Sequence, residues 1–231
     1  MISFLNYSFS MIYKALKKID PRFLFFLFIL ALSFIYNYHK IAFYRPQSVH
    51  HWRQSDCASL TLNYYQNGMH FFQPETHNLT SKDFTSGKAA TSEIPLLYYV
   101  IASLYKVFGY HEYIYRILNT LIFFAGLYSL FRALTKLNVN FILSLTLSLI
   151  FFASPVLVYY GNNFLTDMTA FSFSLVAWNF FVSYYQLRKM KFFWISMTFF
   201  FLAMSMKISA GLSVVALFCI YCLETFSLVK F

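Results

Sequence analysis

The fold of this chain is decided by the segment YIYRILNTLIFFAGLYSLFRAL, residues 113–134, which carries charges only near its two ends. A helix needs about 20 mostly apolar residues to cross the hydrocarbon core of a bilayer, and this segment is long enough. Similar apolar runs lie on both sides of it, at 22–38, 140–159, 168–187, 192–206 and 208–226. We therefore predict an all-α polytopic membrane protein with a bundle of about six transmembrane helices.

The composition supports this class. Hydrophobic residues make up 59% of the 231 residues and charged residues only 11%, whereas soluble domains carry about 25% charged residues. So few charges cannot cover a water-facing surface, which excludes a soluble enzyme and a disordered chain. The three cysteines are an odd number, which argues against a secreted disulfide scaffold. The net charge of +10 fits the basic cytoplasmic loops of membrane proteins, and no soluble domain remains to bind nucleic acid.

Residues 39–93 form a long polar stretch with five of the six histidines and four of the eight acidic residues. It is followed by IPLLYYVIASLYKVFG, residues 94–109, which is apolar but short and contains Lys106. At 1.5 Å per residue this segment spans about 24 Å, less than the roughly 30 Å of the hydrocarbon core. We expect it to form a helix that lies at the membrane interface rather than across the membrane.

This placement of 94–109 gives a charge distribution that follows the positive-inside rule. The cytoplasmic side then receives the N-terminus and the basic residues Arg132, Lys136, Arg188, Lys189, Lys191 and Lys230. Loops 39–112 and 160–167 lie on the extracytoplasmic side. If 94–109 crossed the membrane, the basic residues at 188–191 would face outward, and Asp167 would be separated from the polar stretch.

The chain divides into a cytoplasmic N-terminal amphipathic segment, 1–21, and a transmembrane region, 22–231. Lys14, Lys17 and Lys18 alternate with apolar residues in the first segment, which predicts a short helix on the membrane surface. A cleaved signal peptide is the alternative interpretation. The apolar run is not followed by a clear small-residue cleavage site, which favours an uncleaved signal anchor.

Three acidic residues are catalytic candidates because the predicted topology places them on one side at membrane level: Asp56, Glu93 and Asp167. Asp56 ends the motif HHWRQSD at 50–56, and a carboxylate in such a loop can act as a general base. The alternatives are a solvated loop charge for Asp56, helix-dipole compensation for Glu93 and an N-cap for Asp167. Acids at bilayer depth are costly and usually functional, which favours catalysis for the group.

Arg53, Arg116 and Lys207 are the candidate substrate-binding cations. Lys207 lies between two apolar runs at the predicted outer edge of the bundle. It could bind a lipid phosphate as a point charge, or it could extend to the headgroups without a specific partner. Arg116 allows the same two interpretations. The histidines match no metal-binding spacing, so we expect no histidine metal site.

The order of these motifs resembles the GT-C membrane glycosyltransferases. An early span is followed by WRQSD at 52–56, a polar loop, and SEIPLLYYVIASLYKVFGYHEYIYRILN at 92–119. FLTDMTAFSF at 164–173 and SMKISAG at 205–211 are similar to the second acidic site and the Thr-Lys-Gly segment of that family. The likeness is to bacterial relatives of the protein O-mannosyltransferases and of the lipid A aminoarabinose transferase, and it covers about residues 20–215.

The resemblance implies a helix bundle whose extracytoplasmic first loop contains juxtamembrane helices. It implies inverting transfer of a sugar from a polyprenyl phosphate in the lipid bilayer to a protein, lipid or glycan acceptor, at the outer face of a bacterial inner membrane. Asp56 would be the base, and Lys207 and Arg116 would lie near the leaving phosphate. Glu93 and Asp167 would shape the pocket or, as in some members, bind a divalent metal.

The chain also departs from the family. Cys57 follows Asp56 where several relatives have Glu or Thr, and Ile94 stands where some have Lys. Family members are usually longer, so the resemblance implies a truncated or minimal form without their C-terminal part. The alternatives are a transporter or non-catalytic scaffold, or a surface-polysaccharide polymerase or ligase. Spans without internal charges argue against a transporter.

Overall fold

The computed structural model describes residues 20–77 and 93–226, in which all the regular elements are helices. In chain order these are α2 (Pro21–Ile35), α3 (Tyr38–Ile41), α4 (His51–Asn67), α5 (Leu96–Phe108), α6 (Tyr113–Lys136), α7 (Phe141–Ala153), α8 (Pro155–Gly161), α9 (Asp167–Leu187), α10 (Met190–Met206), the 3-10 helix η1 (Ile208–Gly211) and α11 (Leu212–Thr225). The predicted amphipathic segment 1–21, apart from its last two residues, lies outside the described residues, as does Lys230.

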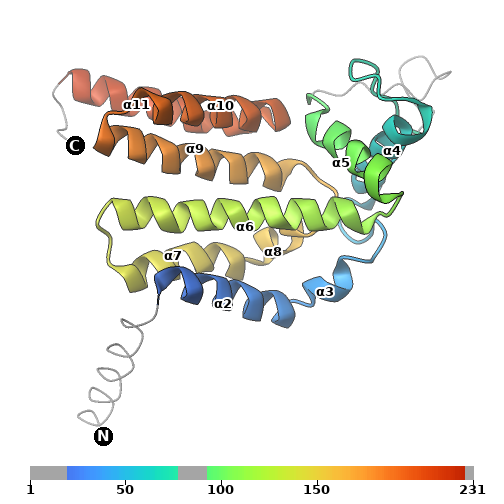
Figure 1. Ribbon diagram of the computed structural model, residues 1–231, viewed down its shortest axis with the longest axis horizontal. Helices are drawn as coiled ribbons and strands as arrows, with labels where there is room; N and C mark the ends of the chain where they lie inside the picture. The colour runs from blue at the N-terminus through green and yellow to red at the C-terminus, as the bar shows by residue number, and fades with distance from the viewer. Residues whose placement is uncertain (1–19, 78–92, 227–231) are drawn as a thin grey trace, which may run out of the picture.

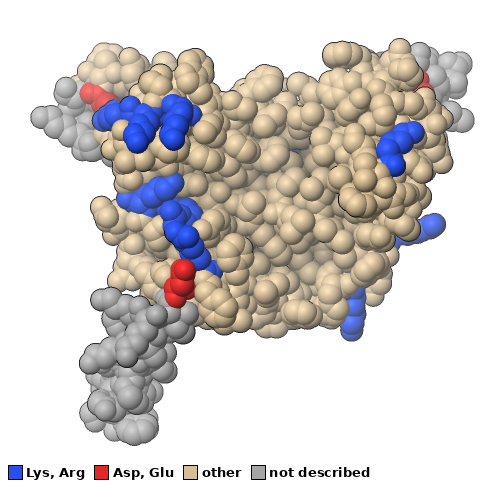
Figure 2. Space-filling view, in the orientation of Figure 1, with Lys and Arg blue, Asp and Glu red and all other residues tan. Residues whose placement is uncertain are grey.

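The long helices run alongside one another, and α4 and α5 lie together at one end of them (Figure 1). In this bundle α9 packs against both α6 and α10, while α2 packs against α7. The segment 94–109, predicted to lie at the membrane interface, contains α5, which packs against α4 at this end of the bundle. Most Lys and Arg side chains visible in Figure 2 gather at the opposite end. The orientation of the bundle relative to a membrane stays a prediction.

Among the described residues, two helices are long and apolar enough to cross a membrane, Tyr113–Lys136 and the continuous run Ile208–Thr225. A third candidate arises if α7 and α8 are counted as one span. Helices α2 and α10 are apolar but shorter than such a span, with 15 and 17 residues. The structure therefore supports an integral membrane protein, and the number of six spans remains a prediction.

The expectation of one continuous helix over 140–159 is wrong. The chain breaks at Ser154, whose backbone is extended, and α8 is bent by 74° from α7. Pro155 opens α8 at its first position. Proline has no N–H to donate to the preceding turn, and its ring clashes with that turn, so the helix cannot pass through it undisturbed.

Helices α6 and α9 approach each other closely at Gly126. A Cβ atom built on Gly126 would lie 2.7 Å from the Cα atom of Ser172 in α9. Small residues at such crossings allow backbones to approach in membrane bundles, where lipid supplies no hydrophobic force between helices. The contact fixes α9 against α6 and therefore positions the first residue of α9, Asp167.

The described part of the polar stretch after α2 includes a long helix. It contains α4, which begins directly after Ser48 and His50, two non-glycine residues with positive φ angles of 68° and 58°. Such backbone angles are uncommon for these residue types. Helices α4 and α5 pack against each other, and a juxtamembrane position for them stays a prediction.

Candidate functional site

Four charged side chains from four separate segments meet where α4 and α5 join the bundle. Arg53 Nη2 in α4 lies 2.9 Å from Glu93 Oε1 and 3.8 Å from Asp167 Oδ2. Lys207 Nζ, between α10 and η1, lies 3.0 Å from Asp167 Oδ1 and 3.7 Å from Glu93 Oε1. We call these four residues the charge cluster. Two cations face two carboxylates, so the cluster is close to electrically neutral.

Glu93 is the residue most firmly held in the charge cluster. Its Oε2 accepts hydrogen bonds from Thr166 Oγ1 at 2.8 Å and from Tyr98 at 3.4 Å. The next residue, Ile94, donates its main-chain N–H to the carbonyl of Ser205 near the end of α10. Glu93 therefore joins α5, α9 and α10, and its role is larger than dipole compensation at a helix start.

Asp167 does not act as an N-cap. It is the first residue of α9, and the preceding Thr166 occupies the cap position without a side-chain cap hydrogen bond. The carboxylate of Asp167 instead faces Lys207 and Arg53. Sequence reasoning placed Asp167 on the same side as Glu93, and the structure brings these two acids into one cluster.

Asp56 lies three residues after Arg53 on α4 but takes no part in the ion pairs. Among the described residues no cation lies within ion-pair distance of its carboxylate, and no hydrogen bond to that carboxylate occurs. Burial raises the pKa of Asp56, because removal from water disfavours the charged form. For Arg53, burial lowers the pKa, but the Asp167 and Glu93 carboxylates outweigh this and raise it.

Arg116 is not part of the charge cluster. It is 2% exposed, and it donates from Nε to the carbonyl of Tyr44 at 3.0 Å and from Nη2 to that of Arg45 at 3.1 Å. Its Nη1 donates to the carbonyl of Asn162, and the guanidinium stands 4.6 Å from the centre of the Phe164 ring. Arg116 therefore binds the main chain at 44–45 and at Asn162 to α6. The sequence did not indicate this role.

A cavity of about 300 Å³ opens beside the charge cluster and is lined by Asp167 and Lys207 at its polar end. It continues along α9 past Phe171, Leu175 and Trp178. From Asp167 to Trp178 the helix rises by about 16 Å at 1.5 Å per residue. The cavity therefore offers charges at one end and, along its length, apolar side chains together with the hydroxyl groups of Ser174, Ser209 and Ser213. It has room for a ligand with a charged head and a partly apolar body.

The residues present do not fit a divalent metal. Within the described ranges, no group of three or more His, Cys, Asp or Glu side chains is placed to hold a metal ion. Glu93 and Asp167 are already balanced by Arg53 and Lys207 within 4 Å. A metal ion at this place would have to compete with the Arg53 and Lys207 side chains for the two carboxylates.

Sequence reasoning missed Tyr98 and Gln54. Tyr98 is buried, donates to Glu93 and lies 3.3 Å from Cys57 Sγ, so it connects α4 with α5. Burial raises the pKa of the Cys57 thiol to about 11, which makes this thiol unreactive. One tyrosine among 19 carries no signal of such a role. Gln54 is 1% exposed and donates to Tyr159, 105 residues away, a contact that the sequence does not indicate.

Comparisons with models of known protein families, with curated proteins and with solved structures found no match for this chain.

Proposed function

We propose that the protein is a membrane glycosyltransferase that moves a sugar from a polyprenyl-phosphate donor to an acceptor at the α4–α5 end of the bundle. The positive-inside rule, applied to the sequence, predicts that this end is extracytoplasmic. The family resemblance suggests this reaction, and the arrangement of Lys207, Arg53 and Asp56 is compatible with it. The observation that carries the proposal is the cavity that has Asp167 and Lys207 at one end and Phe171, Leu175 and Trp178 along α9.

This cavity matches the chemistry of a polyprenyl phosphate. The phosphate is anionic and would lie near Lys207, the cation that lines the cavity, since an ammonium group forms charge-assisted hydrogen bonds with phosphate. It would there take the place of Asp167 as the partner of Lys207. The isoprenoid chain is apolar and would lie along Phe171, Leu175 and Trp178.

The state of Asp56 suits a general base. A general base needs a carboxylate that is not held by a counter-ion, with a pKa raised toward the working pH. Asp56 would take the proton of the acceptor hydroxyl as its oxygen attacks the anomeric carbon of the sugar. The bond from that carbon to the phosphate oxygen would break, and the polyprenyl phosphate would leave with its electron pair. One displacement of this kind inverts the anomeric centre.

The two cations would then act on the leaving group. Negative charge grows on the phosphate oxygen as the bond breaks, and preorganised cations stabilise such developing charge. Arg53 lies one helical turn before Asp56, so α4 would present the base and one cation together. Lys207 is held by its ion pair with Asp167 at the start of α9.

The experiment is transfer from radiolabelled polyprenyl-phosphate sugars by membranes that contain the full chain. Consumption of one donor is expected, and Asp56→Asn should lower transfer by about 10²- to 10⁴-fold, since this is the usual contribution of a positioned base. Asp83→Asn makes the same change in the same polar stretch, at a residue outside the described ranges and outside every motif. Equal rates for the two variants would remove Asp56 from the mechanism, and consumption of no donor would remove the proposed function.

A further inference from the structure

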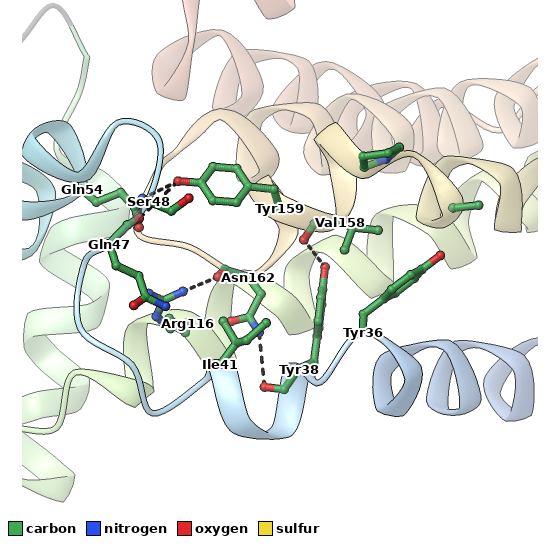
Figure 3. A pocket seen from close by; sticks show the side chains of 12 residues that line it. Tyr36, Tyr38, Ile41, Gln47, Ser48, Gln54, Arg116, Val158, Tyr159 and Asn162 are labelled. Carbon is green, nitrogen blue, oxygen red and sulfur yellow. Dashed lines mark hydrogen bonds between the residues drawn. The ribbon is translucent and has the colours of Figure 1, made fainter.

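A second cavity, of about 460 Å³, lies on another side of α4 from the charge cluster. Figure 3 shows its walls, which come from the segment after α2, the start of α4, α8 and the residues that follow it. Gln54 lines this cavity, whereas its neighbour Arg53 belongs to the charge cluster. Consecutive helix residues point about 100° apart, so Gln54 and Arg53 face different neighbours.

We propose that this second cavity binds a neutral, hydroxyl-bearing ring, such as the sugar unit of a glycan. Its volume falls in the range of about 300–1,000 Å³ that is usual for small-molecule sites, which combine apolar walls with a few polar groups. The binding site stands on the observations below. It does not depend on the proposed function, because Asp56 lies two residues after Gln54 and points about 200° away from it around α4. The second cavity would therefore be a sugar site separate from the place where Asp56 would act.

The first observation is a pair of hydrogen-bond acceptors without donors. Gln54 and Asn162 are 1% and 4% exposed, and both line the cavity. Gln54 Oε1 and Asn162 Oδ1 have no hydrogen-bond partner. A buried polar atom without a partner costs about 1–3 kcal/mol. Hydroxyl groups of a ligand would supply the missing donors after a small movement of either side chain.

The orientation of both amides is fixed by their nitrogen atoms. Gln54 Nε2 donates to the carbonyls of Gln47 and Val49 and to Tyr159 Oη, at 3.0, 3.2 and 2.8 Å. Asn162 Nδ2 donates to the carbonyl of Tyr38 at 3.3 Å. Exchange of oxygen and nitrogen would break these bonds, so the unpartnered atoms are oxygens that can only accept.

The second observation is the aromatic and apolar part of the wall. Tyr36, Tyr38 and Tyr159 line the cavity together with Ile41 and Val158 (Figure 3). A pyranose ring presents hydroxyl groups at its edge and C–H groups on its faces. Flat tyrosine rings offer large, rigid contact area for such faces, while the amide oxygens serve the edge.

The charges of the wall favour a neutral ligand over an anion. Arg116 is the cation among the lining residues, and its Nε, Nη1 and Nη2 each donate to a main-chain carbonyl. Free amide oxygens would repel a phosphate or carboxylate. Within 20–77 and 93–226, no acidic side chain lines the cavity, so a cationic ligand would find no counter-ion there either.

The third observation is the strained backbone of segment 48–50, which borders the cavity at Ser48. Ser48 and His50 have positive φ angles, and Gln54 and Tyr159 both hydrogen-bond to the main chain of Val49 between them. Strained backbone of this kind gathers at ligand clamps and persists where surrounding contacts hold it. Here the contacts that hold segment 48–50 come from Gln54 and Tyr159, which both line the cavity.

The test uses saturation-transfer NMR on the full chain in nanodiscs, with a panel of neutral methyl glycosides as probes. Val158→Trp fills the cavity, while Val156→Trp makes the same change two residues earlier on α8, at a side chain that is 61% exposed and outside the lining. We expect saturation transfer to at least one glycoside, loss of affinity by tenfold or more in Val158→Trp, and no loss in Val156→Trp. Tyr36→Ala removes one aromatic wall and should weaken the same signal, which keeps the test decisive if Val158→Trp fails to fold.

Three results would overturn the proposal. They are saturation transfer to no glycoside, equal signals in the two tryptophan variants, or displacement of the glycoside by inorganic phosphate at millimolar concentration. Donor consumption is measured separately on the same samples. Glycoside binding without donor consumption would leave the site standing and reject the glycosyltransferase. Donor consumption without glycoside binding would reject the site alone.

Discussion

Replacement of Lys207 by methionine would separate a structural from a substrate-binding role of the charge cluster. The substitution leaves Arg53 alone against the carboxylates of Glu93 and Asp167. A hydrogen bond between charged groups contributes about 1.5–3 kcal/mol. Because the Lys207 side chain is 29% exposed, solvent screening places the expected loss near the lower limit, about 1.5 kcal/mol. For a chain of this size that corresponds to a fall in Tm of about 3–6 °C.

The double variant Lys207→Met, Asp167→Asn restores the balance between positive and negative charge. Arg53 then faces only Glu93, to which it is already bonded at 2.9 Å. We expect the double variant to recover most of the lost Tm. If Lys207 binds the donor phosphate, however, both variants should lose donor affinity by about ten- to a hundredfold, since the charge-assisted contact is missing in each.

The assay is thermal unfolding of the chain in nanodiscs, followed by tryptophan fluorescence, together with titration of undecaprenyl phosphate. Lys106→Met is the matched control, because Lys106 lies over the Tyr65 ring and outside the charge cluster. It should change neither donor affinity nor, by more than a degree or so, Tm. If the double variant recovers donor affinity along with Tm, Lys207 acts only by balancing Asp167, and its phosphate role is refuted.

Three further predictions follow from the fold and the site. With the native cysteines replaced, a cysteine at Ser81 should react with an impermeant thiol reagent in intact cells, and one at Met190 only after permeabilisation; the reverse would invert the orientation. Because burial raises the pKa of Asp56, transfer should fall with decreasing pH through a value above the usual 3.9 or so. The same shift means that the charged form of Asp56 costs stability once the pH exceeds that pKa. Asp56→Asn should therefore raise Tm slightly at neutral pH, but not at a pH below both pKa values, and an unchanged difference would contradict burial as the cause. Gly126→Ala should destabilise the chain by about 1–3 kcal/mol through overpacking, whereas Gly211→Ala, whose new Cβ meets only a flexible methionine side chain, should leave Tm nearly unchanged.

Much of the helical architecture could be predicted from apolar runs, because lipid requires long stretches of apolar residues with internally satisfied backbones. The boundaries of α6 and α9 lie within two residues of the expected spans. The break between α7 and α8 was missed although Pro155 was visible in the sequence. The run 140–159 is apolar on both sides of that proline, and hydropathy reports composition rather than continuity of hydrogen bonds.

The candidate site was predictable in its acids and less so in its contacts. The topology argument placed Glu93 and Asp167 on one side, and the structure pairs both with Lys207. It could not tell that Arg116 points to main-chain carbonyls, because a basic residue near a helix end has the same sequence signature in either role. Gln54 carried no signal, since its importance depends on a cavity formed by segments more than 100 residues away.

Arg53 and Gln54 are neighbours on α4, so this helix links the charge cluster to the second cavity. Each residue anchors α4 to a different wall, Arg53 to Glu93 and Gln54 to the 47–49 main chain. A rotation of α4 about its axis would therefore disturb the Arg53–Glu93 ion pair and the Gln54 hydrogen bonds together. A ligand that turns α4 at the second cavity would then also change the charge cluster, and by linkage any such effect on binding is equal in both directions.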